Sequence, residues 1–192
     1  MGVVKKDYCP HVLGIDDGPF EKGVSSTTPI VGVMTEGARL VEAVAVTTFP
    51  VDGNDVTSFL AEWIQNLRFG PALQAVIFGG VTIAGLGVVD IVDLAERLGI
   101  PAMVVNRRDR TNHRLRHAFE AAGLSARLQI VEGMPPIFQV TEGLFAASAG
   151  IDQEAATRLI KSTLAKSELP EPLRIAHLIA RALVRGESRG RP

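Results

Sequence analysis

The stretch "HVLGIDDGPF", residues 11–20, is an apolar run that ends abruptly in two acids and a Gly-Pro turn. Val12 to Ile15 carry the aliphatic side chains that are typical of a buried strand. Asp16 and Asp17 follow directly, and glycine and proline then interrupt the strand pattern. The stretch therefore predicts a first strand that delivers two adjacent carboxylates to its carboxyl end.

Two further strand patterns follow a polar loop that is rich in glycine and serine. "IVGVMTEG" and "ARLVEAVAVTTFPV" are rich in β-branched residues, and a turn at Glu36 and Gly37 joins them. Three strands with short connections predict an antiparallel meander at the start of the chain.

Beyond the meander, helical and strand-like patterns alternate. We expect strands at "LQAVIF", "PAMVV", "LQIVE" and "IFQV". We expect helices from Asp55 or Thr57 to Leu67, Val88 to Leu98, Asn112 to Ala122, Asp152 to Ala165 and Pro172 to Val184. The order predicts an α/β fold in which a mixed sheet, antiparallel in strands 1–3 and then built of parallel α/β units, is flanked by helices. One domain over residues 1–185 and a flexible tail over 186–192 are expected.

The bulk properties narrow the class of protein. The chain has 192 residues, a formal net charge of -1 and one cysteine, so it has no intrachain disulfide and no cysteine-rich zinc site. No apolar run approaches the roughly 20 residues that a membrane helix needs, and the N-terminus does not look like a secretory signal. We expect a cytoplasmic protein without a membrane partner. Because the net charge is nearly zero, a nucleic-acid partner would need a local basic patch.

Acidic residues also stand at the end of the third predicted strand. Asp52 and Asp55 lie in "FPVDGNDVT", and Asp16 and Asp17 could converge with them at one edge of the sheet. Converging carboxylates bind Mg²⁺ or Mn²⁺ through hard oxygen ligands. The alternative is that both acidic pairs are ordinary Asp-Gly turns.

Basic residues gather in two places. "NRRDRTNHRLRH", residues 106–117, puts Arg107, Arg108 and Arg110 at a strand end, where guanidinium groups suit phosphate oxygens. The alternative is a solvated basic helix face.

The last predicted helix carries a second set of basic residues. Arg174, His177, Arg181 and Arg185 share one of its faces. His177 is a candidate phosphate contact or proton donor, unless it merely pairs with a carboxylate on the surface.

A glycine-rich stretch, "GGVTIAGLG" at residues 79–87, lies between a strand and a helix. It lacks the G-x-G-x-x-G spacing of a dinucleotide loop. Backbone at Gly80 and Gly85 that approaches a nucleic-acid substrate closely is the better functional interpretation. Asp90 follows this stretch, and we expect it to stabilise the start of the next helix through the helix dipole.

Five motifs in order resemble the archaeal domain of unknown function 99 family, known in places as endonuclease dU and related to endonuclease V. They are "HVLGIDDGPF", "VDGNDVT", "GGVTIAGLGVVDI", "GIPAMVV" and "PEPLRIAHLIARAL". The resemblance implies a ribonuclease-H-like fold and a divalent-metal nuclease acting on DNA that contains a deaminated base. It implies catalytic roles for Asp16, Asp52 and His177, with metal held by Asp16 and Asp52 and assisted by Asp17 or Asp55.

One position departs from the family pattern. Where the family has an Asp-Gly pair after the "VIF" strand, this chain has Gly79-Gly80. Loss of a carboxylate lowers the charge and the coordination of a hard-cation site, although Asp17 or Asp90 could compensate. The resemblance therefore leaves two functions open, an endonuclease of impaired activity and a degenerate protein that binds nucleic acid without cutting it. A third, weaker alternative is a small-ligand or protein-interaction domain.

Overall fold

The structure is a computed structural model that describes residues 8–107, 113–166 and 168–189. Its strands are β1 (His11–Asp17), β2 (Thr27–Glu36), β3 (Leu40–Pro50), β4 (Ala75–Phe78), β5 (Thr82–Ile83), β6 (Gly87–Val88), β7 (Ala102–Asn106), β8 (Phe138–Thr141) and β9 (Leu144–Ala149). Its helices are α1 (Val56–Gln65), a 3-10 turn at Gly70–Ala72, α2 (Ile91–Leu98), α3 (His113–Ala121), α4 (Arg127–Glu132), α5 (Gln153–Ser162) and α6 (Glu171–Arg185). Within those ranges no helix is long and apolar enough to cross a membrane.

Seven strands form one mixed sheet in the order β3-β2-β1-β4-β7-β9-β8. β1, β2 and β3 are an antiparallel meander, and β4 and β7 continue the sheet parallel to β1. β9 and β8 then complete it in antiparallel fashion. The predicted mixed α/β fold is therefore confirmed.

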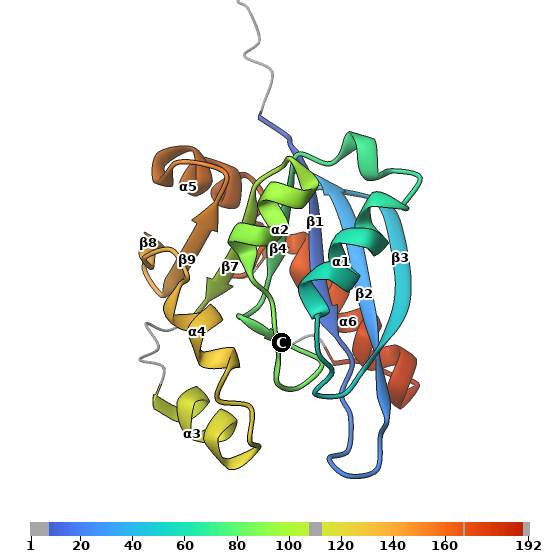
Figure 1. Ribbon diagram of the computed structural model, residues 1–192. Coiled ribbons are helices and arrows are strands. Elements are labelled where there is room, and N and C mark those ends of the chain that lie inside the picture. Colours follow the sequence, from blue (N-terminus) through green and yellow to red (C-terminus); the bar gives the residue numbers. More distant parts are fainter. Residues whose placement is uncertain (1–7, 108–112, 167, 190–192) are drawn as a thin grey trace, which may run out of the picture.

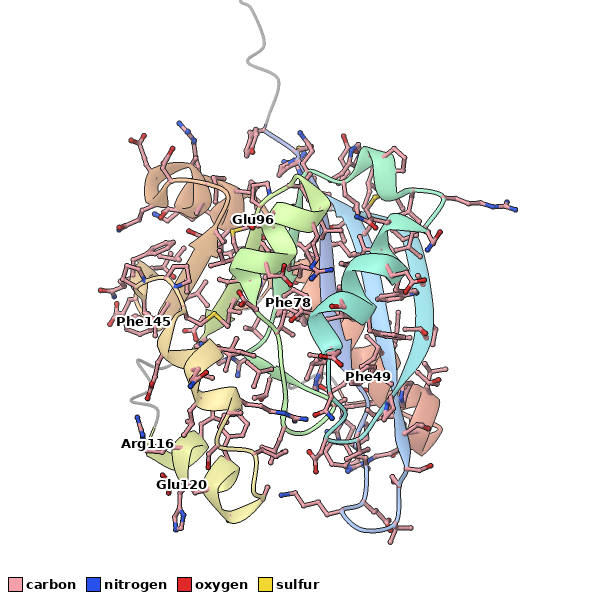
Figure 2. All side chains as sticks on the ribbon, viewed as in Figure 1. Phe49, Phe78, Glu96, Arg116, Glu120 and Phe145 are labelled. Atoms are coloured by element: carbon pink, nitrogen blue, oxygen red, sulfur yellow. The ribbon has the colours of Figure 1, made fainter. Side chains whose placement is uncertain are left out.

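Helices cover both faces of the sheet. α1 and α2 lie in front of it, and α6 lies behind β1 and β2 (Figure 1). The front layer encloses apolar side chains such as Phe49 and Phe78 (Figure 2), and the rear layer packs α5 and α6 on alternate residues such as Val12 and Ile77. Because successive strand residues point to opposite faces, every central strand is apolar on both sides.

Several parts of the secondary structure differ from the sequence prediction. The glycine-rich stretch forms the hairpin of β5 and β6, so Val88 belongs to β6 and α2 begins at Ile91. "LQIVE" is not a strand but part of α4, because Leu128 and Val131, three residues apart, pack together against Phe119 and Val88. The tertiary contact outweighs the β propensity of this short run. The strand β9 was not predicted, although glycines at positions 143 and 150 bound its apolar segment.

Candidate functional site at the carboxyl ends of β1 and β4

A cavity of about 190 Å³ lies where the neighbouring strands β1 and β4 end. The two strands are parallel, with Gly14 opposite Ile77 and Ile15 opposite Phe78. This register, continued by one residue, places Gly79 opposite Asp16. The cavity lining comprises Ile15, Asp16, Asp17, Phe78, Gly79, Gly80, Thr82 and Ile83. The site therefore lies at the carboxyl edge of a parallel strand pair, where α/β proteins bind ligands.

Asp16 faces α6 and meets His177. The Nδ1 atom of His177 lies 2.6 Å from Oδ2 of Asp16, although the two residues are 161 positions apart in sequence. Both side chains keep about a quarter of their surface exposed, at 25% for His177 and 22% for Asp16. When the carboxylate is ionised it only accepts, so Nδ1–H is the donor and Nε2 lies on the far side of the ring. The structure thus brings together two of the three residues with a predicted catalytic role.

Close packing between β1 and α6 makes this meeting possible. Gly14 has no side chain, and a Cβ placed there would lie 2.3 Å from the backbone nitrogen of Leu173. His177 follows Leu173 by one helical turn and therefore projects from the same side of α6. The glycine in "HVLGIDD" accordingly determines how near His177 comes to Asp16.

Asp17 points to the opposite face of the sheet edge, as strand alternation requires. Its Oδ2 accepts a hydrogen bond of 3.0 Å from the backbone amide of Ala84. Burial, and next the charge of Asp16, raise the pKa of Asp17 from 3.8 to about 6, while the amide of Ala84 and the nearby His177 act in the other direction. The two adjacent acids therefore have different partners.

Asp52 is part of the same arrangement as Asp17. Its Oδ1 accepts a 2.7 Å bond from the amide of Leu86, and its own amide donates to the carbonyl of Ala84. Gly85 lies between these two contacts with φ of 89°, and a Cβ there would lie 2.3 Å from Oδ1 of Asp52. Gly85 thus permits the close approach of Asp52, and its proposed contact with nucleic acid stays a prediction.

Arg127 completes this arrangement and was missed from the sequence. Its guanidinium donates to the carbonyls of Leu86, Asp52 and Gly53 at 2.6–2.9 Å and to the side chain of Asn54 at 2.6 Å. The residue is only 9% exposed. We call Asp17, Asp52 and Arg127, with the loop 84–86 that they hold, the loop clasp. Arg127 is the first residue of α4, and the run that follows it, "LQIVE", was expected to be a strand.

Asp55 and Asp90 stand at the starts of helices. The helix expected from Asp55 or Thr57 begins at Val56; Asp55 precedes it with φ of 56°, and its side chain makes no capping hydrogen bond. The hydroxyl of Thr57 accepts from the amide of Asp90. Asp90 itself caps α2 by accepting from the amides of Val92 and Asp93, and its predicted role at the helix start is confirmed.

The predicted basic residues are spread out in the structure. Arg107 follows β7 directly, whereas Arg108 and Arg110 lie outside the described residues. Arg174 does not line the cavity; its Nε and Nη2 donate to the carboxylate of Glu171 at 2.9 and 2.7 Å, and this pair lowers the pKa of Glu171. Contacts of these arginines with phosphate stay predictions.

The cavity has carboxylate oxygens, which are the ligands that a hard cation prefers, but among the described residues too few of them come together to form a full ligand set. Within residues 8–107, 113–166 and 168–189, no group of three or more His, Cys, Asp or Glu side chains is placed to hold a metal ion. Asp16 faces α6, whereas Asp17 and Asp52 turn to the loop 84–86. Gly79 adds no ligand beside Asp16. The described residues therefore do not bring together the ligands for a pair of ions, and a Mg²⁺ or Mn²⁺ ion held by Asp16 stays a prediction.

Comparison with known structures defines the class to which this fold belongs. An endonuclease V from Ciona intestinalis, in complex with a 24mer DNA containing an inosine followed by a ribo-adenosine, has a TM-score of 0.61 at 12% identity over 93% of this chain and 87% of that one. The endonuclease V from Streptomyces avermitilis has a TM-score of 0.58 at 15% identity, covering 96% and 87%. The chain therefore has the ribonuclease-H-like fold of endonuclease V.

Nearer relatives fix the family. The sequence profile of the endonuclease dU family matches residues 10–184. A UPF0215 protein from Methanothermobacter thermautotrophicus is 36% identical over 94% of this chain and 90% of its own. A protein of unknown function from Archaeoglobus fulgidus has a TM-score of 0.84 at 30% identity, covering 92% and 99%. This chain belongs to the endonuclease dU family.

Proposed function

We propose that the protein is a divalent-metal-dependent endonuclease of the endonuclease V type that cuts DNA containing a deaminated base. The observation that carries the proposal is the contact of His177 with Asp16, and Asp16 lines the cavity at the carboxyl ends of β1 and β4. Membership in the endonuclease dU family and the fold of endonuclease V support it.

The chemistry assigned to the pair follows from its geometry. A bound Mg²⁺ or Mn²⁺ would activate water and stabilise the leaving oxygen of a phosphodiester. Asp16 holds the ring of His177 through Nδ1, which fixes the ring orientation. Nε2 is then the ring nitrogen that can contact a phosphate oxygen or give a proton to the leaving group.

A nicking assay tests the proposal. Duplex DNA with one hypoxanthine or one uracil is incubated with the protein and Mn²⁺ or Mg²⁺, beside a duplex in which a ribonucleotide follows the hypoxanthine. We expect Asp16→Ala and His177→Gln each to lower the nicking rate by about 100-fold or more. Asp93→Asn is the control, because Asp93 pairs with Arg97 on the exposed side of α2. Equal nicking by wild type and Asp16→Ala would reject the assignment.

A degenerate nucleic-acid-binding protein is the second candidate, and Gly79 favours it. The continued register puts Gly79 beside Asp16, where the family pattern has an acid. A Cβ at Gly79 would lie 3.5 Å from Cδ2 of Leu173, an ordinary contact, so the site has room for a side chain. The chain therefore lacks the third acid without having filled its place.

Two matched glycine variants separate the candidates. Gly79→Asp places a carboxylate beside Asp16, whereas Gly80→Asp adds the same charge one residue on, where a Cβ meets nothing within 4 Å. If the wild type binds the duplex without nicking it, the degenerate function predicts a gain of nicking in Gly79→Asp and none in Gly80→Asp. Nicking by the wild type would reject the degenerate function directly.

A further inference from the structure

A second cavity lies at the end of α6, away from the residues assigned above. Its volume is about 330 Å³, and it is lined by Arg181, Arg185, Glu187 and Arg189. Three guanidinium groups and one carboxylate leave an excess of two positive charges. Glu187 lies 3.8 Å from Arg189, and both side chains are largely exposed, so this ion pair is weak. The cavity is thus an electropositive hollow of a size that admits an anion.

Arg181, one of the residues that line this cavity, has an unmet hydrogen-bond donor. Its Nε is buried and finds no hydrogen-bond partner in the part of the chain that the structure describes. Buried donors are rarely left unpaired in native proteins. Arg174, on the same helix, has a partner for its Nε, because its Nε and Nη2 both donate to Glu171. The open donor points to a partner that the described part of the chain does not supply.

Helix stability alone does not account for this arrangement. Arginines in the last turn of a helix interact favourably with its dipole, and that explains Arg185, which ends α6. The dipole acts on charge and needs no buried Nε. A bound acceptor such as a phosphate oxygen satisfies both the charge and the open donor of Arg181.

The position of the cavity relative to Asp16 follows from the way α6 runs beside β1. Gly14 contacts α6 at Leu173, Asp16 meets it at His177, and Gly18 approaches it at Ala180 and Val184. The helix and the strand therefore run in the same direction (Figure 1). Arg181 and Arg185 therefore follow His177 along α6, in the direction in which β1 runs past Asp16 to its carboxyl end.

His177, Arg181 and Arg185 succeed one another at intervals of four residues on one side of α6. Each interval advances about 6 Å along the helix. A nucleic-acid strand advances about 3.4 Å per nucleotide along a duplex. If the duplex axis runs parallel to α6, each interval between these basic side chains therefore corresponds to about two phosphates of one strand.

We propose that the cavity of Arg181, Arg185 and Arg189 binds a backbone phosphate of the nucleic-acid strand whose scissile bond lies at Asp16 and His177. The inference rests on the proposed function in one respect, that the ligand is nucleic acid. It adds a positioning contact that fixes the register of the strand about two to four nucleotides from the reacting phosphate.

Binding and cutting are measured separately to test the inference. Binding is followed by fluorescence anisotropy of a labelled 30-base-pair duplex with one hypoxanthine, in EDTA, over a series of salt concentrations. We expect Arg181→Gln and Arg185→Gln each to weaken binding by about tenfold and to reduce the slope of log K against log salt by about 0.9. Arg158→Gln on α5 is the matched control, since Arg158 is an exposed arginine far along the chain from the cavity. Thermal melting of each variant verifies that it folds.

A conservative variant separates charge from hydrogen bonding. Arg181→Lys keeps the positive charge and removes Nε–H, so we expect a salt slope near that of the wild type with an affinity that stays lowered. A structural role of Arg181 would instead lower the melting temperature of Arg181→Lys and leave the salt slope unchanged in all variants, which would overturn the inference.

The remaining outcomes are distinct for the two proposals. A wild type that binds but does not nick, with binding lost in the arginine variants, rejects the proposed function and upholds the phosphate site. Nicking and salt slopes unchanged in Arg181→Gln and Arg185→Gln reject the phosphate site and uphold the function. Thermal stabilisation by inorganic phosphate that requires Arg181, without any effect of the variants on duplex binding, identifies a site for free phosphate and also overturns the inference.

Discussion

Asp16 and Asp17 are neighbours in sequence, yet they belong to two different structures at one sheet edge. Asp16 turns to α6 and pairs with His177, with both side chains partly open to solvent. Asp17 turns to the other face and, with Asp52 and Arg127, forms the loop clasp, which holds backbone amides and carbonyls. The first arrangement leaves a ring nitrogen for a ligand, whereas the second uses its polar groups to shape the cavity wall.

The difference shows that acids at strand ends need not share the same partners. Two or three of the four acids were expected to converge. Alternation along β1 separates Asp16 from Asp17, and Asp52, with φ of 57°, contacts the loop 84–86. Each acid of the loop clasp already has an amide partner. Metal ligation by these acids remains a prediction, and the following substitutions test it together with the contrast between the two arrangements.

Arg127 is expected to have the largest effect of any residue of the loop clasp. Arg127→Met leaves the carbonyls of Asp52, Gly53 and Leu86 without their donor, so we expect the free energy of unfolding to fall by about 4 kcal/mol. Urea denaturation followed by circular dichroism measures the loss. The exposed Arg158→Met is the control, with an expected change within about 0.5 kcal/mol. If the free energy of unfolding fell no more in Arg127→Met than in the control, the loop 84–86 would not depend on Arg127 for its stability.

Gly14→Ala changes the contact between β1 and α6 that brings His177 close to Asp16. The new Cβ meets the backbone of α6 at 2.3 Å, where no flexible side chain can yield, so we expect a loss of about 3 kcal/mol. The displacement of α6 also carries His177 away from Asp16. Gly80→Ala provides the matched control, because its Cβ meets nothing within 4 Å. Similar unfolding curves for both alanine variants would mean that α6 tolerates a wider spacing from β1.

How far the sequence could predict the two arrangements differs in an instructive way. The strand, its terminal acids and the helix that carries His177 are local patterns, and family resemblance joined them across 161 positions. The loop clasp depends on Arg127 reaching residues more than 40 positions away, and no local pattern reports such a contact. The alternation that separates Asp16 from Asp17 was available from the strand prediction itself.

Substitutions at Asp52 distinguish a structural role in the loop clasp from a role as a metal ligand. Asp52→Ala removes the acceptor of the Leu86 amide and places alanine at a φ of 57°, so we expect a loss of about 2 kcal/mol in urea denaturation. Asp52→Asn keeps an oxygen acceptor and tolerates this conformation, so we expect a loss below about 1 kcal/mol. If nicking is present in the wild type, Asp52→Asn should retain most of it. A stable Asp52→Asn protein without activity would instead establish the carboxylate as a ligand.

Asp17 gives the smallest expected effect, and its sign depends on pH. Its pKa rises from 3.8 to about 6 in the folded protein, chiefly because of burial. The folded state therefore holds the Asp17 proton more tightly than the unfolded state does. The resulting stabilisation is complete below pH 3.8 and is lost as the pH rises through 6.

Asp17→Asn removes this titration and keeps an oxygen for the Ala84 amide. We expect the variant to gain about 1 to 2 kcal/mol relative to the wild type between pH 4 and pH 7.5, measured by urea denaturation in EDTA. The gain should persist in the Asp16→Asn background but become smaller, because Asp16 is the second cause of the raised pKa. A difference between Asp17→Asn and wild type that does not change with pH would place Asp17 in a solvated setting, and the contrast between the two acids would then rest on hydrogen-bond partners alone.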